Sequence, residues 1–200
     1  RTFLEIDDQV TINDLLKGII IQSGNDASIA LAECLAGTET DFATLMNVYA
    51  KKLGMKNTNF INSSGWPEKN HYSTVRDLAI LSNSLIKDFF DFYEYFKLKE
   101  FTYNNIKQPN RNKLLTKVRG ADGLKTGYTK KAGYCLVTSA LRGKRRLISV
   151  VLGAKTPEQR TNASKALLEY GFRFYESHKI FNAKTLLHEA RIYNGEKKMV

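Results

Sequence analysis

Apolar side chains recur at helical spacing through the first third of the chain, and polar clusters interrupt them. Thr11-Ile12-Asn13-Asp14 has the pattern of a capping box and precedes an apolar stripe over residues 12–19. The polar segment at 22–26 ends this helix, and a second helix is predicted over about 27–36. A third helix follows over 38–53, because Gly37 and Gly54 stand where helix-ending residues belong.

The rest of the chain mixes one more helix with short apolar runs of the strand type. Residues 55–72 are irregular and polar, and Thr74 and Asp77 open a fourth helix that extends to about residue 89. A small hairpin is predicted over 101–106 around Asn104-Asn105, and three strands follow at 124–128, 134–141 and 146–154. A last helix begins at Thr156-Pro157. Helices, then an antiparallel sheet, then a long helix predict an α+β sandwich rather than alternating βαβ units.

The chain changes character near its C-terminal end. Residues 189–193 have a strand-like pattern before Asn194-Gly195. We therefore predict a main domain over residues 1–178 and the start of a small β-rich domain over residues 179–200.

The chain is strongly basic, with 31 Lys and Arg against 20 Asp and Glu and a net charge of +11. Such a charge fits a nucleic acid, an anionic lipid or an anionic glycan. The basic residues are spread out, however, and the densest cluster, residues 142–146, is predicted to be a solvated turn between two strands. Because no zinc-knuckle spacing, aromatic RNA-binding motif or basic heptad region is present, the sequence argues against nucleic acid.

The two cysteines fall in predicted regular structure, Cys34 on a helix and Cys135 in a strand. We expect both to be buried free thiols, and sequence alone leaves a disulfide between them open. The three His give no metal-ligand spacing, so neither a metal nor another cofactor is predicted. No apolar run is long enough to span a bilayer, and no signal peptide is visible.

Two short motifs carry candidate chemistry. Ser23 and Asn25 lie two positions apart in the polar break, where a serine can relay a proton and an asparagine amide can hold a carbonyl. The alternative is that Ser23, Asn25 or Asp26 only caps the next helix. Lys125-Thr126-Gly127 lies in a predicted strand, where alternation places the lysine and the glycine on one face. A cation, a hydroxyl and an approachable backbone suit a peptide that ends in a carboxylate, although all three residues also suit an ordinary exposed strand.

Two arginines are further candidates, Arg111 in Asn110-Arg111-Asn112 and Arg173 in Gly171-Phe172-Arg173. Each guanidinium suits either a bidentate clamp on a carboxylate or a simple surface ion.

The chain resembles the D-alanyl-D-alanine carboxypeptidases among the low-molecular-mass penicillin-binding proteins, which use Ser-x-Asn and Lys-Thr-Gly in this order. The similarity runs through nearly the whole chain. Its segments are 16–27 (LKGIIIQSGNDA), 53–58 (LGMKNT), 73–79 (STVRDLA), 110–112 (NRN), 123–127 (GLKTG), 131–134 (KAGY), 146–149 (RLIS) and 171–174 (GFRF). The resemblance is therefore specific, and it implies an acyl-serine mechanism on peptides ending in D-Ala-D-Ala.

The resemblance also implies roles for the motif residues. Ser23 would pass a proton toward the leaving amine, Asn25 would hold the substrate amide, and Lys125 would supply positive potential beside Ser23. The Lys125–Tyr128 strand edge, including Gly127, would receive the substrate backbone as an added strand.

The resemblance also implies which residues would bind two further parts of the substrate. Thr126, helped by Arg111 or Arg173, would receive the terminal carboxylate. The backbone N–H of Tyr128 would be one oxyanion donor.

The family also uses a Ser-x-x-Lys motif before Ser-x-Asn, in which the serine is the nucleophile and the lysine its base. The 22 residues before Ser23 contain none, and the match at Ser84–Lys87 falls inside a predicted helix, so we interpret it as coincidental. We therefore expect the main domain to lack its N-terminal part. By itself the chain should form no acyl-enzyme and fold poorly.

The sequence thus predicts a serine-type D-Ala-D-Ala carboxypeptidase that trims peptidoglycan stem peptides outside the cytoplasm and binds β-lactams. Any membrane attachment would come from a segment not present here. A non-catalytic cell-wall-binding protein that keeps the cleft is the alternative from another class. A serine β-lactamase shares the motifs but is disfavoured, because the similarity extends into residues 191–195, where a β-lactamase would have ended.

Overall fold

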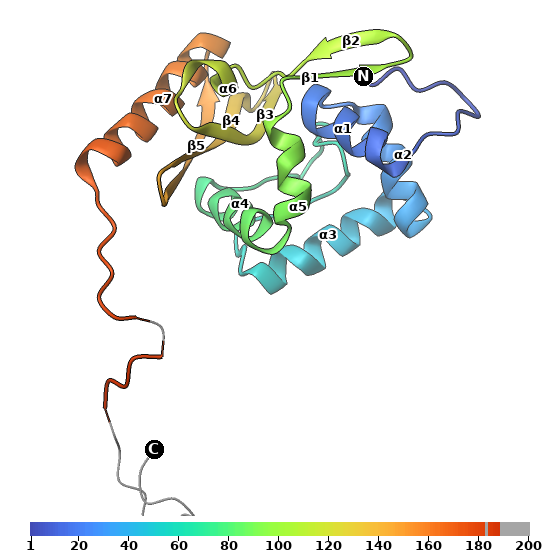
Figure 1. Ribbon diagram of the computed structural model, residues 1–200. Coiled ribbons are helices and arrows are strands. Elements are labelled where there is room, and N and C mark those ends of the chain that lie inside the picture. The colour runs from blue at the N-terminus through green and yellow to red at the C-terminus, as the bar shows by residue number, and fades with distance from the viewer. Residues whose placement is uncertain (183, 189–200) are drawn as a thin grey trace, which may run out of the picture.

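The computed structural model describes residues 1–182 and 184–188, which form a helical half followed by a sheet half (Figure 1). The helical half contains α1 (Ile12–Gln22), α2 (Asn25–Ala36), α3 (Glu39–Leu53), α4 (Val75–Asp88), α5 (Phe90–Tyr93) and the 3-10 helix η1 (Glu94–Lys97). The sheet half contains β1 (Glu100–Tyr103), β2 (Ile106–Pro109), α6 (Leu114–Lys117), β3 (Ala121–Thr129), β4 (Gly133–Arg142), β5 (Arg145–Ala154) and α7 (Pro157–Phe174). The predicted α+β architecture is confirmed.

Threonine side chains begin four of the helices. The hydroxyls of Thr11, Thr38, Thr74 and Thr156 each accept the backbone N–H three residues further on. Each bond satisfies one of the N–H groups that a helix start leaves without a partner. These caps fix the starts of α1, α3, α4 and α7 where the sequence predicted them.

The main sheet is antiparallel in the order β3-β4-β5. Thr126 pairs with Leu136 and Gly127 with Cys135, so one edge of β3 is bound to β4. The other edge of β3 pairs with no strand of the described residues. The separate hairpin β1–β2 turns at Asn104 and Asn105, whose positive φ values of 46° and 59° suit a two-residue hairpin turn.

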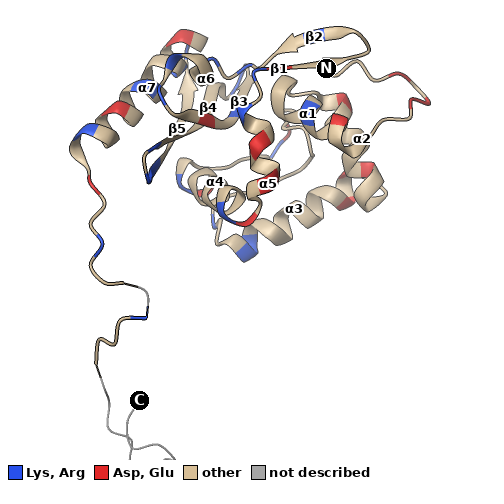
Figure 2. Ribbon diagram, viewed as in Figure 1, with Lys and Arg blue, Asp and Glu red and all other residues tan. Residues whose placement is uncertain are grey.

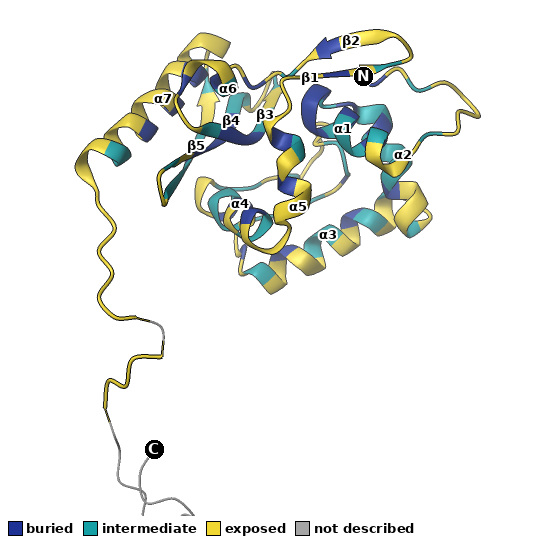
Figure 3. Ribbon diagram, in the orientation of Figure 1, coloured by how far each residue is buried: buried dark blue, intermediate teal, exposed yellow. Residues whose placement is uncertain are grey.

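Helices cover both faces of the sheet, with α7 on one and α4 on the other (Figure 1). One apolar cluster joins α1, α4, η1 and β3 through Ile20, Ile21, Ile86, Phe96 and Leu124, together with Tyr93 and Phe101. A second cluster joins α6, β4 and α7 through Leu114, Val118, Leu136, Ala140 and Leu168. Figure 3 shows the burial concentrated in α1 and the sheet, whereas much of α3 is exposed. The motif-bearing parts, α1 and β3, therefore belong to the best-packed region.

The basic cluster at 142–146 is only partly the solvated turn that the sequence suggested. Arg142 forms an ion pair with Glu169 of α7 at 2.5 Å, and Arg145 donates to the carbonyl of Phe172 at 2.5 Å. Arg146 points into the protein and pairs with Asp122 at 2.8 Å. Charge density along the sequence missed this, because the pairing side chains come from elements 24 to 27 residues away.

The prediction of two buried thiols is wrong for Cys34, which is exposed on α2, whereas Cys135 is partly buried in β4. Both are free, so no disulfide joins them. Cys34 lies near the C-terminal end of α2, on its outer side, where the helical spacing alone could not tell a buried position from an exposed one.

The predicted second domain lies largely outside the described residues. The described residues after α7, 175–182 and 184–188, contain no helix or strand, and the strand expected at 189–193 falls outside them. Among the described helices, none has the length and apolar character needed to cross a membrane.

Candidate active site

A lysine from β3 and a serine from the α1–α2 break are in contact. The Lys125 ammonium donates a hydrogen bond to the Ser23 hydroxyl, although 102 residues separate the two in sequence. The same ammonium donates to the backbone carbonyl of Thr126 at 3.0 Å. The fold thus joins the two motifs that the sequence singled out.

Ser23 is held in an uncommon backbone conformation. It closes α1 with φ 55° and ψ 47°, in the left-handed region that residues other than glycine rarely adopt. Its N–H stays bonded to the carbonyl of Ile19 at 3.1 Å, and α2 restarts two residues later. A strained serine between two helices is typical of a site where the surrounding structure fixes a side-chain direction. Here that direction is toward Lys125.

Ser23, Asn25 and Asp26 are not ordinary side-chain caps. The residue before α2 is Gly24, and no side chain caps that helix. The Asp26 carboxylate instead accepts the backbone N–H groups of Thr2, at 2.8 Å, and Phe3, at 2.9 Å. Burial by itself would raise the pKa of Asp26, but the backbone donors together outweigh burial and hold this pKa below its usual value.

Lys125 is enclosed among cations. Its pKa is lowered to about 8, first by burial and then by the positive charges of Arg111 and Arg160. Burial favours the neutral form of an amine, and like charges nearby do the same. A lysine whose pKa lies near neutrality can exchange protons with a neighbouring hydroxyl, and its surroundings attract an anion.

Arg111 reaches this region through a well-anchored segment. The buried amide of Asn112 donates to the carbonyl of Gly123 in β3 at 3.0 Å and accepts the N–H of Leu114 at 3.1 Å. The Arg111 N–H donates to the carbonyl of Ile21 in α1 at 3.3 Å. The segment therefore connects the end of α1 to the start of β3.

Arg160 is a candidate residue that the sequence reasoning missed. It lies in the first turn of α7, nine-tenths buried, and donates to the carbonyl of Cys135 at 3.3 Å. Its Nε is buried with no hydrogen-bond partner among the described residues. A positive charge at a helix N-terminus interacts unfavourably with the helix dipole. An arginine in the predicted first turn of a helix was therefore the signal in the sequence that could have pointed to a functional role.

The open edge of β3 beside these cations has room for another chain. A Cβ added at Gly127 would meet only the Cβ of Cys135, at 3.8 Å, so the glycine is not required by packing within the described protein. Tyr128 is more than half exposed and stacks on Tyr134 with ring centroids 4.2 Å apart. Arg160 lies over the other tyrosine, 5.7 Å from its ring centroid. An extended peptide along this edge would run past Lys125, Thr126 and Gly127.

Comparison with known proteins agrees with this geometry. A family model described as D-alanyl-D-alanine carboxypeptidase matches residues 1–156. The chain belongs to the D-alanyl-D-alanine carboxypeptidase family. It is similar to D-alanyl-D-alanine carboxypeptidase DacC of Escherichia coli (strain K12), with 50% identity over 199 residues that cover 99% of this chain and 50% of that protein.

Solved structures of penicillin-binding proteins have the same fold as this carboxypeptidase-family chain. Penicillin binding protein 5 from Haemophilus influenzae superposes with a TM-score of 0.94 at 44% identity, covering 100% of this chain and 59% of that one. Penicillin-Binding Protein D2 from Listeria monocytogenes, solved in its ampicillin-bound form, superposes with a TM-score of 0.76 at 40% identity, covering 81% and 68%. The chain spans about half the length of the curated relatives that it matches.

The remaining predicted residues of the carboxypeptidase site lie in different places. Asn25 begins α2, two residues after Ser23, and lines a cavity together with residues of α2, the start of α3 and the α3–α4 loop. Arg173 is exposed in the last turn of α7, with its guanidinium 5.3 Å from the ring centroid of Phe174. Thirteen residues of helix, about 20 Å at 1.5 Å per residue, separate it from Arg160. The structure therefore brings Arg111 and Arg160 to the site, and places Arg173 at the other end of α7.

The Ser-x-x-Lys match in this carboxypeptidase-family chain lies inside α4. The Ser84 hydroxyl donates to Asp88 at 2.6 Å, four residues on, and Lys87 is exposed in the last turn of the helix. Neither side chain has a hydrogen bond to the Ser23–Lys125 pair, in agreement with a coincidental match.

Proposed function

We propose that the whole protein that contains this chain is a serine-type D-Ala-D-Ala carboxypeptidase, which removes the terminal D-alanine from peptidoglycan stem peptides outside the cytoplasm. The contact between the Lys125 ammonium and the Ser23 hydroxyl carries the proposal. It is supported by the open β3 edge, by the surrounding arginines and by the named relatives, which are carboxypeptidases and penicillin-binding proteins.

In this proposal the substrate binds as an extra strand on β3. Its terminal carboxylate faces the Thr126 hydroxyl and the guanidinium groups of Arg111 and Arg160, in a region whose charge already lowers the Lys125 pKa. Asn25 holds the amide before the scissile bond. The Tyr128 backbone N–H is one donor to the oxyanion. Gly127 leaves space for the passing chain.

The nucleophilic serine is assigned to a Ser-x-x-Lys segment of the whole protein other than the coincidental match at Ser84–Lys87. Its oxygen attacks the carbonyl of the penultimate D-alanine, and its proton passes through the lysine base, Ser23 and Lys125 to the leaving amine. The C–N bond breaks and D-alanine leaves. Water then attacks the acyl-serine ester, returns a proton to the serine oxygen and releases the shortened peptide. A β-lactam would acylate the same serine.

Release of D-alanine from a peptide ending in D-Ala-D-Ala tests the proposal on the whole protein. We expect Ser23→Ala to lower kcat about a hundredfold, the typical contribution of a positioned proton-transfer group. Ser84→Ala is the matched control, because its hydroxyl serves only Asp88 within α4. The proposal would be overturned if the unaltered protein released no D-alanine. It would also be overturned if the Ser84 variant lost activity while the Ser23 variant kept it.

Labelling with a fluorescent penicillin tests the assignment of the nucleophile. We expect the whole protein to become covalently labelled and the 200-residue chain to remain unlabelled. Labelling of the chain alone would show that the nucleophile lies within it, contrary to the proposal.

A further inference from the structure

The Asp26 carboxylate holds the first residues of the chain against the start of α2. Both of its oxygens accept the backbone N–H of Thr2, at 2.8 and 2.9 Å, and one of them also accepts the N–H of Phe3 at 2.9 Å. Figure 2 shows acidic residues where the N-terminal end of the chain passes α1 and α2. Hydrogen bonds from N–H groups to a carboxylate are charge-assisted and stronger than neutral ones. Asp26 therefore fixes the backbone of Thr2 and Phe3 on this part of the protein.

The segment that Asp26 holds inserts one side chain between α1 and α2. Thr2 is fully buried. A Cβ added at Gly18 or at Gly24 would overlap the hydroxyl oxygen of Thr2, so the two glycines leave the space that this side chain fills. The N–H of Gly24 donates to the carbonyl of Gly18 at 3.1 Å and closes the turn that contains Ser23. Thr2 thus packs on both ends of that turn.

The backbone of Ser23 needs support from its surroundings. Its φ of 55° and ψ of 47° are strained for a residue other than glycine, and such a conformation persists only where neighbouring structure imposes it. Thr2 packs against the adjacent Gly24, and the Lys125 ammonium donates to the Ser23 hydroxyl. Because Asp26 holds Thr2 in place, its carboxylate influences the direction of that hydroxyl through the turn.

We propose that Asp26 is a positioning residue for proton transfer between Ser23 and Lys125. The inference rests on the proposed function, in which Ser23 passes a proton toward the leaving amine. Asp26 holds Thr2, and Thr2 holds the turn from which the Ser23 hydroxyl meets the Lys125 ammonium. The carboxylate thereby aligns the reacting hydroxyl, although no hydrogen bond joins it to Ser23 in the described part of the chain.

Asp77 has the same kind of structural role elsewhere in the fold. Like Asp26, it lies in the first turn of a helix and holds a passing segment, through the N–H of Asn57 at 2.8 Å and the hydroxyl of Thr58 at 2.7 Å. It is fully buried. Within the described residues, neither of its partners has a hydrogen bond to the Ser23–Lys125 pair. Asp77→Asn therefore removes an anchor of the same type at a different place.

Release of D-alanine from a peptide ending in D-Ala-D-Ala tests the inference on the whole protein. Asp26→Asn keeps the size of the side chain but replaces one accepting oxygen with an amide nitrogen that cannot accept an N–H. We expect kcat to fall about tenfold and KM to change less than about threefold, because the alignment for proton transfer is lost while the β3 edge is unaltered. Asp77→Asn should lower stability to urea at least as much and change kcat by less than about twofold. The kcat of each variant is referred to its folded fraction.

The pH dependence separates positioning from a general loss of stability. The Ser23 hydroxyl accepts a hydrogen bond from the charged form of Lys125, and such a bond raises the pKa of a lysine. Turning Ser23 away should lower this pKa, so the decrease in activity at alkaline pH should begin at lower pH in Asp26→Asn. The charge of Asp26 has no direct part in this change, because the charges that act on Lys125 are those of Arg111 and Arg160.

Thr2→Ala tests the same path by removing the inserted atoms while the hydrogen bonds to Asp26 remain. It should also lower kcat. The double variant should be impaired by no more than about twofold beyond the more impaired single variant, because both changes act through one contact.

Two results would overturn the inference and leave the proposed function intact. One is that the Asp26 and Thr2 variants keep the kcat and the pH profile of the unaltered protein. The other is that Asp77→Asn lowers kcat and shifts the pH profile as much as Asp26→Asn does. If the unaltered protein releases no D-alanine, the proposed function and this inference are both overturned.

Discussion

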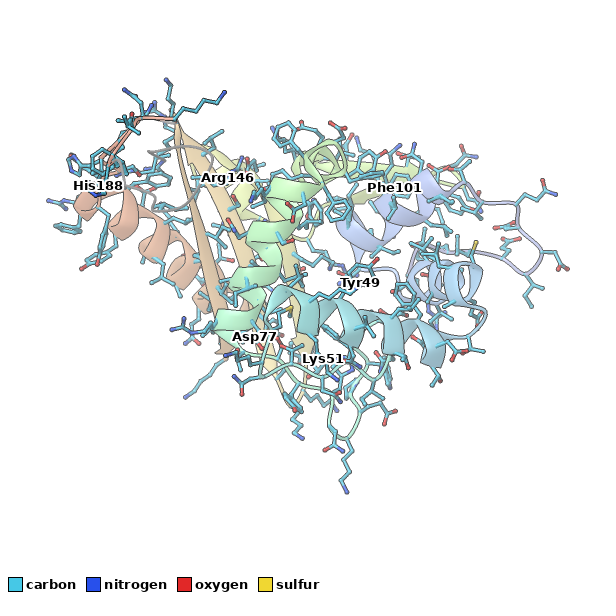
Figure 4. All side chains as sticks on the ribbon, turned by 90° about the horizontal axis from the view of Figure 1, so that it is seen from below. Tyr49, Lys51, Asp77, Phe101, Arg146 and His188 are labelled. Carbon is cyan, nitrogen blue, oxygen red and sulfur yellow. The ribbon has the colours of Figure 1, made fainter. Side chains whose placement is uncertain are left out.

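Two charged groups lie three residues apart on β3, the buried Asp122 and the half-buried Lys125, and they have opposite surroundings. Asp122 accepts hydrogen bonds from the Tyr93 hydroxyl at 2.7 Å and from Arg146 at 2.8 Å. The Arg146 guanidinium also donates to Ser139 at 2.6 Å, and Figure 4 shows it between the sheet and the helices α4 and α5. Lys125 has a hydroxyl and a carbonyl as partners, and the charges acting on it are the cations Arg111 and Arg160.

In the proposed function, this difference separates a charge that stabilises the fold from one that binds the substrate. At Asp122 the opposite charges neutralise each other, and burial, together with the neighbouring carboxylate, raises the pKa of Tyr93 well above its usual value. At Lys125 the described residues supply no neutralising carboxylate, so an incoming anion would supply it. A partly buried cation without a compensating charge destabilises the protein, and in the proposed function the carboxylate of a substrate bound at the open strand edge compensates it.

The largest expected effect is the loss of activity on replacing Lys125. Lys125→Met removes the cation beside Ser23 while keeping an unbranched side chain, and we expect kcat/KM for D-alanine release to fall about a thousandfold. Because the substitution removes a charge that no described carboxylate compensates, the variant should be at least as stable to urea as the unaltered protein. Lys131→Met, in the exposed β3–β4 turn, is the control and should change neither quantity. If the Lys125 variant were clearly less stable than the unaltered protein, Lys125 would stabilise the fold as Asp122 is expected to do, contrary to the prediction.

Asp122→Asn should have the opposite consequences. It leaves Arg146 with reduced compensation in a partly buried position, so we expect the free energy of unfolding to fall by about 3 kcal/mol. Urea denaturation measures this. The double variant Asp122→Asn with Arg146→Met should recover part of the loss, because no unpaired charge remains. If the double variant is less stable than Asp122→Asn alone, the pair does not act as a compensated charge pair.

The starts of the capped helices and the approximate positions of the strands could be predicted from the sequence, because they depend on local signals. The short helices α5, η1 and α6 and the place of β3 beside β4 were not predicted. Threonine caps, the glycines after α2 and α3, and the Asn104-Asn105 turn each act within a few residues. The meeting of Ser23 and Lys125 was inferred from the family resemblance, since no local pattern joins residues 102 positions apart.

The surroundings of Lys125 could not be predicted in the same way. Arg160 was overlooked in favour of Arg173, because both lie on one helix and only the packing of α7 on the sheet shows which end faces the site. Similarly, the basic run at 142–146 gave no indication that Arg146 turns inward to Asp122. Both errors concern side chains whose partners are distant in sequence.

Because the pKa of Lys125 is lowered, the difference in stability between the unaltered protein and Lys125→Met should depend on pH. Its folded-state value of about 8 lies below the ordinary 10.5, so folding expels a proton between these values and stability rises with pH across that window. Below pH 8 the burial of the ammonium group destabilises the protein by about 3 kcal/mol at most. The stability advantage of Lys125→Met should therefore be full at pH 7 and shrink toward zero as the pH approaches 10.5. Urea denaturation of both proteins at several pH values measures the difference, and an advantage independent of pH would contradict the assignment.

The smallest expected effect distinguishes the two arginines of α7. Arg160→Gln removes a buried guanidinium near Lys125, and we expect KM for the D-Ala-D-Ala peptide to rise about tenfold through loss of one charge-assisted contact with the carboxylate. Arg173→Gln makes the same change at the far end of the helix and should alter KM by less than about twofold, since exposed charges at this distance are screened.

The Arg160 variant should also raise the pKa of Lys125, because one of the two cations that lower it is gone. We expect activity to decrease at alkaline pH as Lys125 loses its proton, and this decrease should move to higher pH only in the Arg160 variant. If KM rises more in the Arg173 variant than in the Arg160 variant, the carboxylate does not bind beside Lys125, and the cations there have another role.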